Sequence, residues 1–168
     1  MRRGADLRHR RRQLAGDLTG TLPNPKLATQ PAVRVEDDTQ VELTSATAVL
    51  MDLDDEIFDT AEMHPGNGND DRIRVPRTGT YVLSGEVEWA PNGSGYRTLD
   101  LVQLNAGLAA LGSSLVEPRD SAIQPTIQQV TAIVRLAEGA TIGLRAGQAS
   151  GVDLEIVRGT LSAAFVGP

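Results

Sequence analysis

The 168-residue chain has no cysteine, only two histidines (His9 and His64) and a single lysine, Lys26, beside fifteen arginines. The missing thiol excludes disulfides, cysteine nucleophiles and thiolate-ligated zinc. With a single lysine, a P-loop or a Schiff-base site is not expected. Aromatic residues make up 3% of the chain, too few for a platform on which nucleic-acid bases stack. The sequence therefore predicts a protein that is not an enzyme and that binds no metal or cofactor.

Long apolar runs are also missing. No stretch of roughly 18 apolar residues is available to cross a membrane, so we expect no membrane insertion. The basic residues 8–12 are not followed by the apolar run of a secretory signal, which predicts a chain made without a signal peptide. The composition, 40% hydrophobic and 23% charged, is that of a globular protein.

The net charge of −6 is unevenly distributed. Residues 1–30 carry seven basic and two acidic groups, whereas the rest carries nine basic and twenty acidic groups. The two parts therefore have net charges of +5 and −11, and we expect them to meet different partners.

Residues 1–31 form the first predicted unit, an extended arm. Residues 1–12 are rich in arginine, and residues 13–31 contain glycines and prolines that interrupt a helix. The residue before each proline favours extended backbone. Such a segment builds no core alone, so it is either disordered or lies against another chain.

Residues 32–168 form the second unit, where short apolar-polar alternations are separated by turn residues. The clearest alternation is in residues 80–90, where Tyr81, Leu83, Gly85, Val87 and Trp89 share one face. This pattern of short alternating segments and turns predicts an all-β sandwich or barrel of about eight to ten antiparallel strands. The expected strands are residues 32–36, 47–53, 72–76, 80–90, 96–105, 108–116, 126–136, 141–146, 154–157 and 160–166.

One predicted strand, residues 126–136, has apolar side chains on both faces. The expected inward residues are Val130, Ala132, Val134 and Leu136. Ile127, Thr131 and Ile133 occupy the opposite face. Apolar residues that face outward fit a subunit interface, although scattered exposed apolar residues are also common on monomers.

Three short runs in the second unit carry a family resemblance. They are FDTAEMH from Phe58, RIRVP from Arg72 and GTYVLSG from Gly79. Their order resembles the jelly-roll domains of the globular complement heads and the tumour necrosis factor group, and especially the versions found in bacteriophage fibre and tail proteins. The resemblance covers roughly residues 33–167 and departs from the pattern over residues 111–125. It implies a jelly roll that assembles as a homotrimer, with Ile127, Thr131 and Ile133 as candidates for the trimer interface.

A second resemblance lies in the arm. The run GDLTGTLPNP, from Gly16 to Pro25, is similar to an element that recurs in phage tail and head fibre proteins, although Leu22 stands where an aromatic residue is usual. This implies that residues 1–31 anchor the trimer to head or tail proteins of a virion. The candidate anchoring residues are Arg2, Arg3, Arg8, Arg10, Arg11, Arg12, Leu18, Leu22, Pro23 and Pro25.

The arginines of the arm allow three interpretations. They could pair with carboxylates on a partner protein, belong to a disordered tail, or neutralise the phosphates of nucleic acid. The resemblance favours the partner protein and makes nucleic acid the least expected of the three.

Acidic residues in the second unit raise the question of cation binding. The segment 52–62 and the loop 66–71 contain oxygen ligands that suit calcium, but their spacing is not that of an EF-hand. We expect a solvated acidic loop. His64 lacks a partner motif for a catalytic triad and is expected to pack or to stabilise a turn. Glu86 and Glu88 share the outer face of one strand, which indicates solvation rather than glycoside cleavage.

Together these observations predict a bacteriophage virion protein: a short trimeric fibre or spike on the virion surface, made in the host cytoplasm. Its jelly roll would project and attach to a glycan or protein of the host surface. The alternative is a capsid decoration or cement protein that stabilises the shell and binds no receptor. A third possibility, a secreted cellular binding module or enzyme, is disfavoured by the missing signal.

Overall fold

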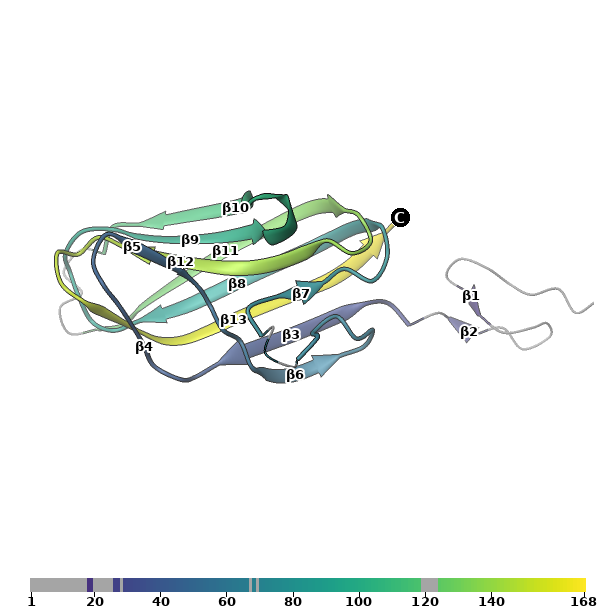
Figure 1. The fold of residues 1–168 in the computed structure, drawn as a ribbon, viewed down its shortest axis with the longest axis horizontal. Helices are drawn as coiled ribbons and strands as arrows, with labels where there is room; N and C mark the ends of the chain where they lie inside the picture. Colours follow the sequence, from purple (N-terminus) through teal and green to yellow (C-terminus); the bar gives the residue numbers. More distant parts are fainter. Residues whose placement is uncertain (1–17, 20–25, 28, 67, 69, 119–123) are drawn as a thin grey trace, which may run out of the picture.

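The computed structural model describes residues 18–19, 26–27, 29–66, 68, 70–118 and 124–168. Two antiparallel sheets pack face to face (Figure 1), which confirms the predicted jelly-roll sandwich. The first sheet has the order β11-β8-β13-β3-β6, with β4 also paired to β13. Its strands are β3 (Ala32–Asp37), β4 (Val41–Leu43), β6 (Asp55–Asp59), β8 (Gly79–Trp89), β11 (Thr126–Leu136) and β13 (Leu154–Gly167).

The second sheet has the order β10-β9-β12-β5, with β7 also paired to β12. Its strands are β5 (Thr47–Leu50), β7 (Ile73–Arg74), β9 (Arg97–Gln103), β10 (Ala109–Val116) and β12 (Thr141–Gln148). A short 3-10 helix, η1 (Leu104–Ala106), follows β9. A two-stranded hairpin, β1 (Leu18–Thr19) and β2 (Lys26–Leu27), precedes the sandwich. No helix among the described residues is long and apolar enough to span a membrane.

The core forms between the facing sheets as the alternation in β8 predicts. Tyr81, Leu83, Val87 and Trp89 are fully buried, whereas the residues between them reach the surface. Burial of each such side chain stabilises the fold by about 1.5–3 kcal/mol. Gly85 continues the same face and leaves space for Leu144 of the other sheet, whose Cδ1 atom would lie 2.4 Å from a Cβ added there. The two sheets therefore approach closely at the centre of the sandwich.

Several strand boundaries differ from the prediction. Residues 154–157 and 160–166 belong to one strand, β13, because bulges absorb the irregular pairing beside β8 instead of ending the strand. The predicted strand 47–53 ends at Leu50, and the buried Met51 and Leu53 follow it. The predicted strand 72–76 shortens to β7. Strands β4 and β6 were not predicted.

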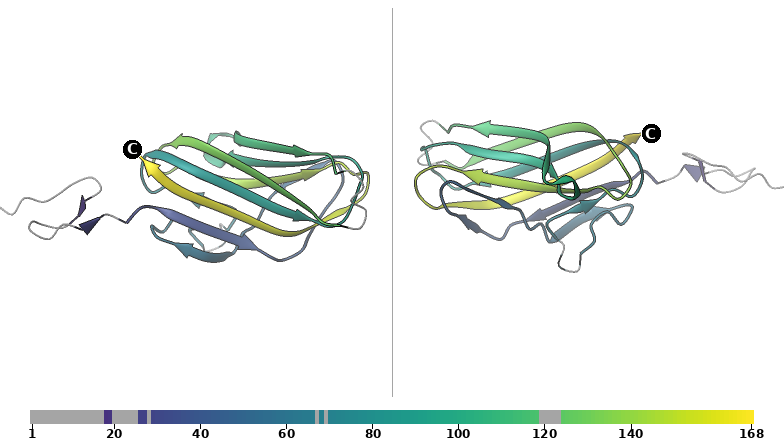
Figure 2. Two further views of the ribbon diagram at one scale, coloured as in Figure 1. Left: turned by 180° about the vertical axis from the view of Figure 1, so that it is seen from behind. Right: turned by 45° about the horizontal axis from the view of Figure 1, so that its top comes forward.

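The sandwich has two different ends. At one end the chain enters β3, and β13 finishes beside it, where the amide of Phe165 donates to the carbonyl of Pro31 at 2.9 Å. The connections β3–β4, β8–β9 and β12–β13 lie at the opposite end, which we call the distal end (Figures 1 and 2). This polarity sets apart the end that carries the arm from an end made of loops.

The negative charge of the sandwich is confined to one segment of its sequence. Residues 35–71 contain twelve Asp and Glu and neither Lys nor Arg, whereas residues 72–168 contain eight acidic residues and eight arginines. The acidic segment forms β4, β5 and β6, and β5 and β6 end the strand order of their sheets. Of these edge strands β6 is the acidic one, with the sequence DEIFD, whereas β5 carries no charged residue. The segment that forms most of the core is neutral overall.

Candidate binding surfaces

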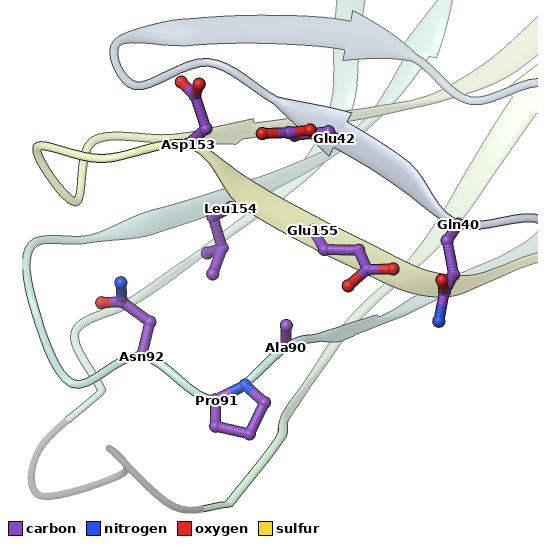
Figure 3. Close-up of a pocket in the computed structure, with 8 residues that line it drawn as sticks. All are labelled: Gln40, Glu42, Ala90, Pro91, Asn92, Asp153, Leu154 and Glu155. Atoms are coloured by element: carbon purple, nitrogen blue, oxygen red, sulfur yellow. The ribbon is translucent and has the colours of Figure 1, made fainter.

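A pocket of about 600 Å³ opens at the distal end. Three connections of the chain contribute its lining, so residues far apart in sequence meet there (Figure 3). Leu154 points from β13 toward the loop of Pro91 and Asn92. The lining residues are Gln40, Glu42, Ala90, Pro91, Asn92, Asp153, Leu154 and Glu155. Two amides and three carboxylates make the lining mostly polar, and Ala90, Pro91 and Leu154 form its apolar part.

Two carboxylates of this pocket stand directly opposite each other. Glu42 of β4 and Glu155 of β13 are register partners in an antiparallel pair, and Asp153 lies next to them. Like charges in that position repel each other and weaken the pair. Within the described residues no cation forms a salt bridge with any of the three. The pocket is therefore strongly negative.

Arg97 fixes the loop that forms one wall of this pocket. Its side chain is fully buried, and its Nη atoms donate to the carbonyls of Asn92, Ser94 and Tyr96 at 2.9–3.2 Å. Burial lowers the pKa of its guanidinium, and Nε lacks a hydrogen-bond partner in the described part. Its guanidinium carbon lies 5.9 Å from the centroid of the Trp89 ring. The loop is thus held by a buried cation bound to carbonyl groups.

Gln128 joins the same network from β11. Its Oε1 atom accepts a hydrogen bond from Trp89 Nε1 at 3.1 Å, and its Nε2 atom donates to the carbonyls of Arg97 and Ser114. The side chain is 1% exposed. Sequence reasoning missed this residue, although it has the same parity along β11 as the inward residues Val130 and Ala132. A glutamine at an inward position of a strand is the signal that could have indicated a buried hydrogen-bond network.

The acidic segment 52–62 is only in part the solvated loop that the sequence predicted. Its carboxylates are mostly exposed, but residues 55–59 form β6, because their backbone pairs with β3 and so joins the sheet edge. Partial burial and then the charges of Asp70, Asp54, Asp71 and Asp37 raise the pKa of Asp52. The raised pKa of Asp52 therefore reflects desolvation first and the surrounding like charges second. Among the described residues no group of three or more His, Cys, Asp or Glu side chains is arranged to hold a metal ion, and residues 67 and 69 of the loop lie outside them.

His64 is buried beside this edge, in agreement with the packing role expected for it. Its side chain is 4% exposed, and Nδ1 lies 3.8 Å from a carboxylate oxygen of Glu56. Its backbone amide donates to Asp59 at 2.8 Å, which closes the bend after β6. Nε2 has no hydrogen-bond partner in the described part of the chain.

Glu86 and Glu88 lie on the outer face of the first sheet and share one cation. Nη2 of Arg158 lies 3.5 Å from Glu86 and 3.7 Å from Glu88, and Gln129 donates a hydrogen bond to Glu86. Pairing with one arginine on an open face is a surface arrangement. The two carboxylates do not flank a cleft of their own, because the nearby hollow of about 140 Å³ includes only Glu86.

The outer face of β11 carries the three residues that the sequence assigned to a trimer interface. Ile127 is 57% exposed, Ile133 is 72% exposed, and Thr131 is also exposed. Ile133 begins an apolar row across the sheet, because the register places it beside Val82 and then brings Ala164 and Ala32 alongside. The outward orientation predicted for the three residues is therefore confirmed.

Most of the anchoring residues predicted in the arm lie outside the described residues. Leu18 lies in β1, opposite Leu27. The remaining ones lie outside the described residues: Arg2, Arg3, Arg8, Arg10, Arg11, Arg12, Leu22, Pro23 and Pro25.

Comparison with solved structures gives the fold a family context. The chain is similar to Eiger TNF from S. frugiperda, with a TM-score of 0.56, 12% identity, and coverage of 82% of this chain and 92% of that one. For the globular domain of zebrafish complement 1qA the TM-score is 0.54 and the identity 14%, over 81% and 96% of the two chains. Murine APRIL at pH 8.0 gives 0.58 and 12%, over 82% and 100%. No family model and no curated protein matches the sequence. These likenesses show the jelly-roll fold alone.

Proposed function

We propose that this chain is a structural protein of a bacteriophage virion, a short trimeric fibre or spike that projects its jelly roll toward the host surface. The observation that carries the proposal is the polarity of the sandwich. The arm enters at the end where β13 finishes, and a pocket of about 600 Å³ opens at the distal end. An anchor at one end and a recognition surface at the other are what a projecting attachment protein requires.

The trimeric part of the proposal rests on the outer face of the first sheet. The row of Ile133, Val82, Ala164 and Ala32 provides an apolar strip that an isolated sandwich leaves in water. Burial of this strip between copies, together with Ile127, would cover it. A closed threefold arrangement would also present three arms together, so weak contacts of each arm would combine into a persistent attachment.

The homotrimer is tested by light scattering on the full chain. We expect the mass of three copies for the parent protein, and a shift to monomer for Ile133→Arg, because a buried charge at an interface centre costs about 2 kcal/mol or more per site. Val152→Arg, at a residue 55% exposed in the distal loops, is the matched control and should remain trimeric. A parent protein that is monomeric at micromolar concentration would overturn the trimer.

The virion role is tested with particles. Deletion of residues 2–12 should leave the trimer folded but stop its incorporation, and normal incorporation would show that the arm is not the anchor. Host-cell binding by the full trimer, lost on Glu42→Gln together with Asp153→Asn, would support attachment through the distal pocket. Particles that break open when the protein is deleted, with no host binding by the protein, would favour capsid cement instead.

A further inference from the structure

We propose that the arginine-rich segment of the arm, residues 2–12, docks along the acidic strand β6 of its own chain. This interaction goes beyond the proposed anchoring role, because it assigns the arm an intramolecular site on the sandwich. The argument rests on the geometry of the β6 edge, on charge and on the point where the arm joins the sandwich.

Strand β6 has an open side. It pairs with β3 on one side, and in the described part of the chain no strand pairs with its other side. Two large apolar residues are exposed on it, Ile57 at 51% and Phe58 at 46%. An open edge with exposed apolar side chains is a template for an added extended segment, whose backbone can pair with it.

The charges at this edge select a basic occupant. Asp54, Asp55, Glu56 and Glu62 are all exposed, and within the described residues none forms an ion pair with an arginine or lysine. The sequence between Val35 and Asp71 has no basic residue except His64, so the strand cannot be neutralised by its own segment. Residues 2–12 contain six arginines and a single acidic residue, Asp6. Arginine pairs well with carboxylates and also stacks on aromatic rings.

The arm also begins in the right place. Thr60 is the residue after β6. Its hydroxyl donates a hydrogen bond to the carbonyl of Gln30 at 2.8 Å and accepts a hydrogen bond from the backbone amide of Ala32, also at 2.8 Å. The arm therefore joins the sandwich beside the end of β6.

The length of the arm is sufficient for this docking. Because Leu18 lies opposite Leu27 in the hairpin, the reach from Gln30 to Arg12 comes from three residue steps after Leu27 and six before Leu18. Fully extended, these nine steps span about 30 Å, whereas a five-residue strand is about 17 Å long. A short tether gives the arm a local concentration in the millimolar range at β6, so even a weak interaction is populated. The docked arm would be released by salt, or by a particle protein that binds the arginines more tightly.

The chain contains no cysteine, which makes a direct test possible. A spin label on Gly4→Cys in the full protein should broaden the amide signals of Ile57, Phe58 and Thr60 at low salt. Broadening should disappear in 0.5 M salt, because the Debye length is then only about 4 Å. In hydrogen exchange, an arm docked for half the time or more slows exchange at the open edge of β6 by about twofold or more relative to Arg8→Ser/Arg10→Ser/Arg11→Ser/Arg12→Ser.

Matched variants decide the outcome. Asp54→Asn/Asp55→Asn/Glu56→Gln should abolish the broadening, whereas Glu42→Gln/Asp153→Asn/Glu155→Gln removes the same number of charges at the distal pocket and should leave it unchanged. Equal loss in both variants, or no broadening at β6 in the parent protein, would overturn the proposal. Broadening of unlabelled copies in a mixture with labelled ones would also overturn it, since the arm would then come from a neighbouring copy. These readouts use no particle and no mass measurement, so they can fail while the proposed virion role stands.

Discussion

Residues 35–71 and 72–168 belong to one sandwich but differ in nearly every physical property. Five strands of the later segment, β8, β10, β11, β12 and β13, are eight residues long or more, whereas β4 to β6 of the earlier segment contain three to five. The later segment balances its charge, and the earlier one has twelve acidic residues without a lysine or arginine. Both segments contribute buried residues to the core, among them Met51 and Leu53 of the earlier one. The segments therefore differ in strand length and in charge, and the earlier one places its charge at the sheet edge formed by β6.

The largest expected effect comes from truncating a buried side chain of the later segment, compared with an exposed side chain of the acidic edge. Leu144→Ala in β12 removes a fully buried side chain and should lower the free energy of unfolding by about 2–5 kcal/mol. Ile57→Ala on β6 should cost about 0.5 kcal/mol or less, because its side chain is half exposed. Urea denaturation followed by circular dichroism measures both. Similar losses in the two variants would contradict the placement of Leu144 in the core and of Ile57 at an exposed edge.

A smaller effect is expected from the polar network of the later segment. Gln128→Ala leaves Trp89 Nε1 and two carbonyls without their partner in a buried place, which should cost about 1–3 kcal/mol. The adjacent Gln129→Ala is the control, because that residue is exposed and should change stability by less than about 0.5 kcal/mol. Thermal unfolding of the two variants gives the comparison. If Gln128→Ala proved as stable as its neighbour, the buried network would not hold the distal loops.

The smallest effect concerns repulsion within the acidic segment. Because folding raises the pKa of Asp52, its ionisation favours the unfolded chain once the pH exceeds the unfolded pKa of about 4. Asp52→Asn should therefore stabilise the protein slightly at pH 7, by about 0.5 kcal/mol at most, since salt and solvent screen exposed charges. The gain should vanish below pH 4, where both states are protonated. Glu138→Gln in the neutral segment should show no such gain, and a destabilised Asp52→Asn would contradict the repulsion.

The same division explains how far the sequence could predict the fold. The alternation from Tyr81 to Trp89 identified β8 and its buried face, because a long strand repeats its pattern several times. Strand β6 was missed because Asp and Glu disfavour strands, and its place at the sheet edge is set by pairing with β3 rather than by its own residues. The break expected near Gly159 was wrong because the bulge at β8 lets β13 continue.

The distal pocket could not be predicted from the sequence for a different reason. It forms only where Gln40, Pro91 and Asp153 meet, and no short motif connects three loops so distant in sequence. The outward residues of β11 were predictable, since a period of two places Ile127, Thr131 and Ile133 on one face whatever lies opposite. Surfaces built within one strand can thus be predicted from a sequence, and surfaces built between connections cannot.

The hydrogen bond from Phe165 to Pro31 has a practical meaning for anyone who wishes to modify this molecule. A peptide fused after Pro168 would emerge next to the root of the arm and crowd whatever the arm binds. An epitope inserted after Asp38, in the exposed connection between β3 and β4, would emerge at the other end and remain accessible. Gly95 is a poor place for the insertion, because a side chain there would meet the carbonyl of Ala149 at 1.9 Å. The molecule is therefore better suited to display through its loops than through its tail.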